Sequence, residues 1–558
     1  MVDKFTIKEN NCYLNNYERF SYEDENCIAY FKGSITYNYE LIEPEIWIKL
    51  LIKYLVDSKN SFDSVLASEL NRIAGLFSLI IEKDGIYYIV SDIIRSKPVF
   101  YGHYRNNVFI TDNLGNFQKH NQGIEINNDN LDELTVFGFV FGNGTVYKNI
   151  YGLQAGEIVS ISGNKIRSKR YFEFKPANRP GKCKNLSKFA DDYHKILLSI
   201  FSLMIKENPD VNRWIVPLSG GHDSRLTVNY LHLLGIRNVI CFSYGIPNNE
   251  QSNISKKVAE ATGYEWHFVE YTEQKWQALH ERGIIDDFIS YACNGVSTPL
   301  LQDFLAIYEL RERKIINRGD IIVKSHGDFI AGSHLNDVEV PCTTEQDALD
   351  RVIARHCKIS NKSIAPVGRM KEIYKKAKVK PLHFQEYFDW QERQAKFIVN
   401  SAKVYEYFDL KCILPYWHRE NVNFWLSVSD NQRSDRKIFF EAEKQGILID
   451  ALVSLPFAGE SIKPSSFSLI SMVKNMLPPS LVLIFLHLTG RKVKIAEGMN
   501  MMFALKARSI RKLLDPVSDF PYQVLDYFKN ILMRYPYQVD PHLLTSLYTI
   551  RKLLDKNK

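Results

Sequence analysis

Short apolar runs separated by turn residues dominate the first 175 residues. The runs occupy 27–31, 75–81, 85–90 and 108–110, and glycine, asparagine or aspartate stands between several of them. Runs of this kind are typical of β-strands. One segment, 45–56, instead has helical spacing. The pattern therefore predicts an α+β domain dominated by strands and interrupted by one helix.

The pattern changes after 176–184, a segment with two prolines that we interpret as a linker. Strand-like and helix-like segments then alternate. The expected strands are 214–218, 238–244 and 265–271, and the expected helices are 186–206, the segment that follows the first strand up to Leu234, and 252–262. Such alternation predicts an α/β domain with a parallel sheet and helices on its faces.

These changes divide the chain into three predicted parts. Residues 1–175 form the first domain and residues 185–455 form the second. Residues 456–558 are expected to form a helical C-terminal extension, and the pattern does not indicate its role.

Composition and charge narrow the class of protein. Of 558 residues, 45% are hydrophobic and 24% are charged, as in a folded globular protein. The net charge is only +7 and the basic residues are scattered, which argues against a nucleic-acid partner. The eight cysteines form no Cys-x-x-Cys pair, which favours reduced thiols in a cytoplasmic protein. The most apolar stretch, 481–488, is too short to span a bilayer, so no stable membrane insertion is expected.

The sharpest chemical signal is PLSGGHDSR at 217–225, between a predicted strand and a predicted helix. Backbone N–H groups at a helix N-terminus can bind an anion, and two glycines let the backbone approach a phosphate closely. A carboxylate there, Asp223, suits Mg²⁺ bridging phosphate oxygens. The structural alternative is a glycine turn capped by serine and aspartate.

This stretch matches SGGxDS, the loop of N-type ATP pyrophosphatases, whose fold is that of the adenine nucleotide alpha hydrolases. The resemblance implies ATP and Mg²⁺ as cofactors. The nucleotide-binding residues that it implies are Ser219, Gly220, Gly221, Asp223, Ser224, Phe242, Ser243 and Lys324. For Phe242, at the end of the second strand, a role in the core is an equal alternative.

Two later segments resemble asparagine synthetase. The first is KSHGDFIAGS at 324–333, where Asp328 falls on the family's second Mg²⁺-binding aspartate beside Asp223. The second is ILPYWH at 413–418. Ser325, Phe329 and His418 stand where that family has acidic residues. Aspartate is therefore doubtful as the substrate, and the related β-lactam synthetases indicate that such a scaffold can adenylate other carboxylates.

The departures leave the acid/base group open. Glu392 and Glu406 are candidate catalytic residues, and a solvated helix face is the alternative for each. Lys463, beside a proline, is a third candidate, by resemblance to a lysine that stabilises pentavalent phosphate. Its alternative is a surface lysine.

The first domain resembles class II glutaminases, which have the Ntn fold, in GLFS at 75–78, SDIIRSKPVFY at 91–101 and GLQAG at 152–156. That chemistry needs an N-terminal cysteine as nucleophile and an Asn-Gly oxyanion hole. Here Val2 and Lys32-Gly33 stand at those positions. The resemblance therefore implies a degenerate glutaminase domain that has lost its activity.

Together these features predict an ATP-dependent carbon–nitrogen ligase that adenylates a carboxylate and transfers it to ammonia or an amine. One alternative is an amidotransferase that receives its nitrogen from a partner glutaminase. The other is a non-catalytic nucleotide-binding scaffold. A small-molecule carboxylate and an amine are the expected partners, and a homodimer is compatible with all three.

Overall fold

The structure is a computed structural model. It describes residues 6–9, 12–22, 27–57, 62–105, 107–121, 123–176, 186–327, 329–335, 341–357 and 366–458, together with Ser546, Thr549, Ile550 and Leu553. Val2, Asp328, Lys463, nearly all of the predicted linker and nearly all of the predicted C-terminal extension lie outside these residues.

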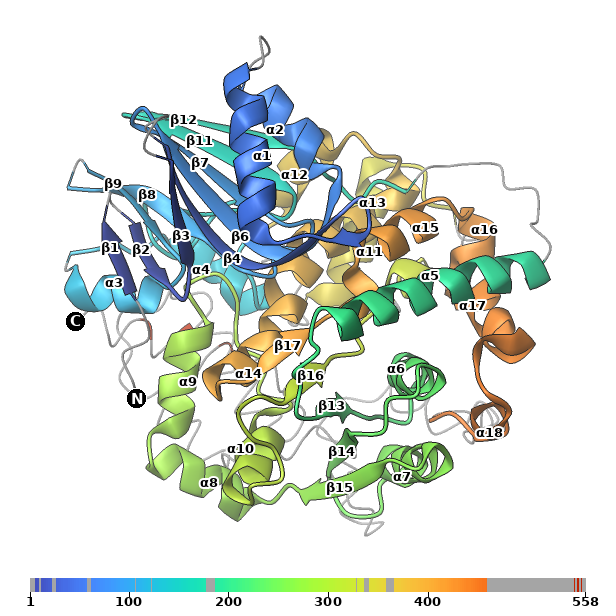
Figure 1. Cartoon of the computed structure of the whole chain (residues 1–558). Helices are drawn as coiled ribbons and strands as arrows, with labels where there is room; N and C mark the ends of the chain where they lie inside the picture. Colours follow the sequence, from blue (N-terminus) through green and yellow to red (C-terminus); the bar gives the residue numbers. More distant parts are fainter. Residues whose placement is uncertain are drawn as a thin grey trace, which may run out of the picture.

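The first region contains two sheets (Figure 1). One has the order β1-β2-β9-β8-β10, and the other has the order β12-β11-β7-β6-β4-β3, with β5 paired to β4. The strands are β1 (Thr6–Glu9), β2 (Cys12–Asn15), β3 (Glu18–Tyr22), β4 (Cys27–Tyr37), β5 (Glu40–Leu41), β6 (Ile73–Lys83), β7 (Ile86–Ser91), β8 (Phe100–Tyr104), β9 (Asn107–Thr111), β10 (Ile150–Gly152), β11 (Glu157–Ser162) and β12 (Lys165–Arg170).

Apolar side chains fill the space between the two sheets. Leu14 and Ile110 come from the first sheet, and Tyr30, Ile80 and Ile89 come from the second. The other face of the second sheet is covered by α1 (Pro44–Asp57) and α2 (Phe62–Leu70), which pack on it through a second apolar cluster. A strand covered on both faces has a nearly continuous apolar sequence, and the apolar runs 27–31 and 75–81 in β4 and β6 fit this rule.

The predicted strands of the first region and the predicted helix at 45–56 are confirmed. The prediction of a single helix is wrong, because α2, α3 (Leu114–His120) and α4 (Asn128–Phe137) also form. These helices are short, and two begin with an asparagine whose side chain accepts a hydrogen bond from the first turn. An asparagine N-cap is visible in the sequence, but by itself it does not identify so short a helix.

The long strands β4 and β6 cross closely at two glycines. Gly33 and Gly75 have φ values of +125° and +146°, and a Cβ on either would lie within 2.1 Å of a carbonyl oxygen on the opposite strand. Only glycine tolerates both conditions. Gly33 follows Lys32, so this crossing fixes the backbone at the edge of a pocket described below.

The second region is built on a parallel five-stranded sheet, as predicted, with the order β15-β14-β13-β16-β17. Its strands are β13 (Trp214–Pro217), β14 (Val239–Gly245), β15 (Glu265–Glu270), β16 (Ile321–Val323) and β17 (Lys411–Ile413). Alternate residues face opposite cores: Trp214 and Val216 pack into one cluster, whereas Ile215 packs into another. Both faces are therefore apolar, as in a sheet covered by helices on each side.

Helices cover both faces of this sheet (Figure 1). One face carries α5 (Leu186–Lys206), α6 (His222–Leu233) and α7 (Glu250–Thr262), all close to their predicted ranges. The other face carries α8 (Glu273–Glu281), α9 (Ile284–Ala292), α10 (Phe304–Glu312) and α14 (Lys403–Tyr407). No helix in the described parts of the chain is long and apolar enough to cross a membrane.

The two regions are joined by side chains from a long helical stretch. It runs through α13 (Pro381–Phe388) and η4 (Asp389–Ile398). From η4, Trp390 Nε1 donates to the carbonyl oxygen of Ile93 at 2.9 Å, and Lys396 Nζ donates to that of Val140 at 2.8 Å. The first region thus serves as a wall against which the second region packs.

Candidate active site

The strand order of the parallel sheet defines where a ligand is expected. From β13 the chain passes first to β14 on one side and later to β16 on the other. The loops that leave the carboxyl ends of β13 and β16 therefore diverge. In open α/β sheets, ligands bind at such a switch point. The glycine loop predicted from the sequence leaves β13 at this place, between Pro217 and His222.

Hydrogen bonds inside the loop hold its shape. Ser224 Oγ accepts from the backbone N–H of Ser219 at 3.2 Å and lies 3.0 Å from Ser219 Oγ. Ser219 Oγ also accepts from the N–H of Gly221 at 3.2 Å. Gly221 is the N-cap of α6 and has no side chain with which to cap it, so the helix begins with N–H groups that can receive an anion.

The second predicted segment lies directly beside this loop. The backbone N–H of Gly327 donates to Asp223 Oδ2 at 3.0 Å, and Ser325 Oγ lies 2.8 Å from Thr227 Oγ1 on α6. A Cβ on Gly327 would lie 2.3 Å from Cβ of Tyr416, so glycine is required there. Asp328, the predicted second metal ligand, lies outside the described residues.

The third predicted segment, 413–418, packs against both. Tyr416 Oη donates to the carbonyl oxygen of Asp223 at 3.1 Å, and Trp417 Nε1 donates to that of His326. Burial lowers the pKa of His326 to about 3, with the charge of Lys324 contributing. The three segments singled out in the sequence thus meet at one point, although about 200 residues separate the first from the last.

A short segment at 455–458 closes one side of the loop. Phe457 stacks on the imidazole of His222 with ring centroids 3.7 Å apart, and its ring also lies 3.6 Å from the guanidinium carbon of Arg225. The N–H of Ala458 donates to the carbonyl oxygen of Gly220 at 3.0 Å. A Cβ on Gly220 would lie 2.8 Å from Ala458 Cβ, which explains why the position is glycine.

The remaining predicted nucleotide-binding residues lie deeper. Phe242 is fully buried in the core on one face of the sheet, and Ser243 is buried at the end of β14. Lys324 Nζ donates to Asp303 Oδ2 at 2.9 Å. Burial raises the pKa of Asp303, but Lys324 and two tyrosine hydroxyls outweigh it and lower that pKa to about 2. The ammonium of Lys324 is therefore committed to an internal pair, and its contact with nucleotide stays a prediction.

Glu392 is not on a solvated helix face, so that alternative is wrong. Its side chain is 2% exposed, pairs with Lys396 four residues later and accepts from the N–H of Gly142 at 2.9 Å. Lys396 also donates to the carbonyl oxygens of Val140 and Gly142. These contacts link Glu392 to both regions and not to the glycine loop, and its catalytic role stays a prediction.

Glu406 is partly buried, with its side chain 17% exposed, and its catalytic role stays a prediction. It accepts from Lys97 at 2.9 Å and from Lys403 at 2.7 Å. Burial would raise the pKa of Glu406, but Lys403 and Lys97 outweigh it and hold the pKa well below its usual range. Burial lowers the pKa of Lys403, whereas that of Lys97 is raised because Glu406 outweighs burial. One carboxylate is thus shared by two ammonium groups.

Glu406 lines a pocket of about 930 Å³ between the two regions. Its wall includes Lys32, Gly33 and Asp112 from the first region. Residues 410–415, together with Trp417 and His418, form the wall on the side of the second region. This wall belongs to the same segment whose Tyr416 touches the glycine loop, so one segment separates the pocket from the loop.

Lys32 occupies the position where the glutaminase resemblance places an asparagine. Its ammonium donates to the carbonyl oxygen of Asn15 at 3.0 Å and to Asp112 Oδ2 at 3.2 Å. The pocket lining holds five basic side chains and four carboxylates: Lys32, Lys97, Arg318, Lys403 and Lys411, and Asp112, Glu207, Glu406 and Asp409. The lining is therefore polar and nearly balanced in charge.

Sequence reasoning missed this pocket. Lys97 stands within a stretch singled out for its resemblance to glutaminases, but nothing local indicated that it pairs with Glu406, 309 residues later. Lys403 precedes Glu406 by three residues, so their pair had a helical spacing signal. Asp112 had none.

Comparison with known proteins assigns the first region. Residues 20–172 match the glutamine amidotransferase domain family. The match covers little more than a quarter of the chain, so it identifies an Ntn-type amidotransferase-like domain with mixed sheets and not the whole protein. No curated protein matches the chain.

Solved structures are similar only distantly. One is described as the allosteric regulatory enzyme of purine biosynthesis (11% identity, 55% of this chain and 56% of that chain, TM-score 0.19). A second is glutamine phosphoribosylpyrophosphate amidotransferase from B. subtilis (12%, 57% and 59%, 0.19). A third is NMN synthetase from Francisella tularensis (12%, 46% and 96%, 0.19). The chain spans a little over half the length of the first two. At these TM-scores the likenesses carry no argument about this protein.

Proposed function

We propose that the chain is an ATP-dependent amide-forming ligase of the asparagine synthetase type. It adenylates a carboxylate, releases pyrophosphate and transfers the acyl group to ammonia or an amine. The observation that supports this most is the contact between Gly327 and Asp223, which joins the loop after β16 to the glycine loop after β13. Both resembling segments therefore belong to one site at the switch point of the sheet.

The loop is suited to a triphosphate for electrostatic reasons. The uncapped N–H groups and the positive end of the α6 dipole favour an anion, and two glycines leave the backbone open to it. Asp223 alone would repel phosphate. Mg²⁺ is commonly bound by one or two carboxylates together with substrate phosphates, so a half-buried carboxylate at this place fits it. When bound, the ion supplies neutralisation of phosphate charge.

The proposed reaction has two steps. A carboxylate oxygen of the substrate attacks the α-phosphorus of ATP, and the bond from that phosphorus to pyrophosphate breaks. The nitrogen nucleophile then attacks the acyl carbon, AMP leaves with the bridging oxygen, and the nitrogen loses a proton. Glu406 is a poor base for this proton because Lys403 and Lys97 hold its pKa far below neutrality. Its proposed task is to hold the two lysines in the wall of the pocket.

The pocket between the regions is the proposed entry for one of the two substrates. Its lining is polar, and the segment 413–418 lies between it and the loop. The first region contributes Lys32 and Asp112 to this wall. We therefore propose that this amidotransferase-like domain binds substrate in place of hydrolysing glutamine.

ATP–pyrophosphate exchange tests the proposal. The purified full chain is assayed against pools of amino acids and sugar acids, with and without ammonium, beside Asp223→Asn. Exposed Asp210, shortly before β13, gives the matched control Asp210→Asn. We expect exchange that depends on one pool, is lost in Asp223→Asn and is kept in Asp210→Asn.

AMP and pyrophosphate must be the products of the complete reaction. If the parent chain binds ATP but forms neither across the pools, with or without an amine, the ligase proposal is wrong. ATP binding without turnover would instead favour a nucleotide-binding scaffold.

A further inference from the structure

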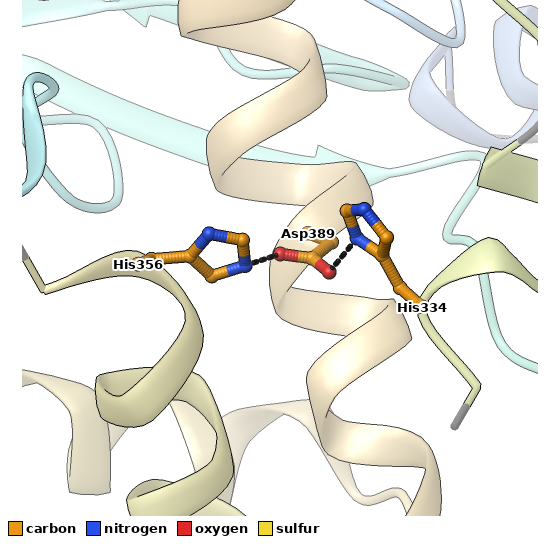
Figure 2. Close-up of side chains that lie close together, drawn as sticks. All are labelled: His334, His356 and Asp389. Carbon is orange, nitrogen blue, oxygen red and sulfur yellow. Dashed lines mark hydrogen bonds and ion pairs between the residues drawn. The ribbon is translucent and has the colours of Figure 1, made fainter. Parts of the chain in front are cut away.

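Three side chains outside the nucleotide loop converge on one point (Figure 2). His334 follows η2 (Phe329–Ser333), His356 ends α11 (Glu345–His356), and Asp389 begins η4. Nδ1 of His334 contacts Oδ2 of Asp389, and Nε2 of His356 contacts Oδ1. The side chains are 14%, 5% and 0% exposed, respectively.

The donor set is that of a transition-metal site. Two imidazole nitrogens and one carboxylate offer ligand atoms that all lie within 4.8 Å of one another. Imidazole with carboxylate suits Zn²⁺ and neighbouring first-row ions, and three protein ligands leave a position for water. Three ligands from three separate elements form a site that a local motif would not reveal.

Two buried atoms of the cluster, Nε2 of His356 and Oδ1 of Asp389, form an ion pair with each other. The geometry of this contact is not that of a regular hydrogen bond, and neither atom has another hydrogen-bond partner among the described residues. An unsatisfied buried carboxylate oxygen or ring nitrogen is costly. A cation bound by the three side chains takes both atoms as ligands.

A second buried His–Asp pair shows the contrasting arrangement. His383 Nε2 and Asp430 Oδ2 form a hydrogen bond of 2.7 Å, and Asp430 Oδ1 accepts a second hydrogen bond from Arg433 at 3.2 Å. The guanidinium of Arg433 thus balances the charge of Asp430. Among the described residues, the ion pairs of Asp389 are with the two histidines alone.

One charge opposes a cation at the cluster. Arg393 lies one turn beyond Asp389 on η4, and its charge acts on His356. An ion bound there must therefore be held by direct ligation from three side chains, because general electrostatic attraction is reduced. This favours Zn²⁺, which binds imidazole strongly, over Mg²⁺, which prefers oxygen ligands.

We infer that His334, His356 and Asp389 bind one transition-metal ion, with Zn²⁺ as the best fit, and that this ion fastens the segment after β16 in place. His334 is seven residues beyond Gly327, whose N–H binds Asp223 in the nucleotide loop. The ion ties this segment to α11 and η4. Its role is to position the loop and does not depend on the proposed ligase activity.

Metal analysis of the full chain tests the inference. The protein is treated with chelator, reconstituted with ZnCl₂ or MgCl₂, desalted and analysed for bound metal, and its melting temperature is measured. We expect about one Zn²⁺ per chain, as for a mononuclear site, and a higher melting temperature with Zn²⁺ than with Mg²⁺. Co²⁺ in place of Zn²⁺ should give the visible absorption of a low-coordinate site.

Variants place the ion at the cluster. His334→Gln and His356→Gln should each lose the bound Zn²⁺ and its effect on the melting temperature, whereas His383→Gln should keep both. The inference is overturned if the parent chain retains no Zn²⁺, or if the two variants bind as much as the parent. A triad held by hydrogen bonds alone gives the first of these results, and that measurement needs no variant to fold.

Discussion

The wall of the pocket between the two regions and the glycine loop of the second region use polar groups in opposite ways. In the pocket wall, Lys32 is paired with Asp112, and Glu406 is shared by Lys97 and Lys403. In the loop, α6 begins without a side-chain cap and Ser219 is exposed. The pocket wall pairs Lys32, Lys97 and Lys403 with its own carboxylates, whereas α6 begins with N–H groups that have no side-chain cap.

The difference shows that apolar packing and polar chemistry depend on separate sets of residues. Strands, glycine crossings and cores of an amidotransferase-like domain remain in the first region, because packing depends on apolar pattern and volume. One of its polar side chains, Lys97, pairs across the boundary between the regions with Glu406. The second region keeps its loop glycines because bulky side chains would collide with Ala458 or Tyr416. The next four changes test this comparison.

The largest effect is expected for Asp223→Asn in the loop. Asparagine keeps an oxygen that can accept from Gly327 but removes the negative charge. We expect ATP–pyrophosphate exchange to fall by about 100-fold or more, as when one charged transition-state contact is lost, with little change in melting temperature. An equal loss of stability and activity would show that Asp223 acts structurally.

The second change breaks the buried pair between the regions. Lys396→Met leaves Glu392 charged, buried and without its cation. Removing one partner of a buried pair costs about 3–5 kcal/mol of unfolding free energy, measured by denaturant titration. Adding Glu392→Gln should recover much of this loss, since a neutral pair replaces a lone charge.

Activity per folded molecule decides whether Glu392 is catalytic. We expect it to be unchanged in the double variant. A fold-normalised loss comparable to that of Asp223→Asn would restore Glu392 as a catalytic residue.

The third change concerns Glu133, on α4 at the same boundary. It is 1% exposed, and burial raises its pKa to about 7, because burial outweighs the attraction of Arg369, which lies 3.5 Å away and is itself 37% exposed. The folded state therefore binds the proton more tightly than the unfolded state, whose pKa is near 4.5. This contribution is fully present below pH 4.5 and is lost as pH rises through 7.

The loss amounts to about 3 kcal/mol at 1.36 kcal/mol per pKa unit. Glu133→Gln should flatten this part of the stability curve and be the more stable form at pH 8. Identical pH profiles for parent and variant would contradict the expectation. Glu406 has the opposite sign: its depressed folded pKa stabilises the protein above about pH 4.5, and this is lost as pH falls below that value.

The smallest effect is expected at the surface. Lys148 and Glu125 form an ion pair whose side chains are 54% and 72% exposed. Solvent-exposed pairs contribute little. Lys148→Ala should therefore leave the melting temperature within experimental error, and it serves as the control for the two buried changes.

Much of the site and fold could be predicted from local pattern. The glycine loop was identified because its residues and its strand–helix setting are contiguous, and α5, β13 and α6 formed close to their expected ranges. The structure brought the segments at 324–333 and 413–418 to the loop. The environments of Glu392 and Glu406 were not predictable, because Gly142 and Lys97 reach them from the other region.

The sequence by itself determined the alternation of strands and helices and the glycine loop. These depend on neighbouring residues, whose spacing and volume act locally. Only the tertiary structure decided which distant charges are paired, which pocket the two regions enclose, and that His334, His356 and Asp389 meet. Burial and Coulomb energies depend on distances in space, and chain separation does not encode those distances.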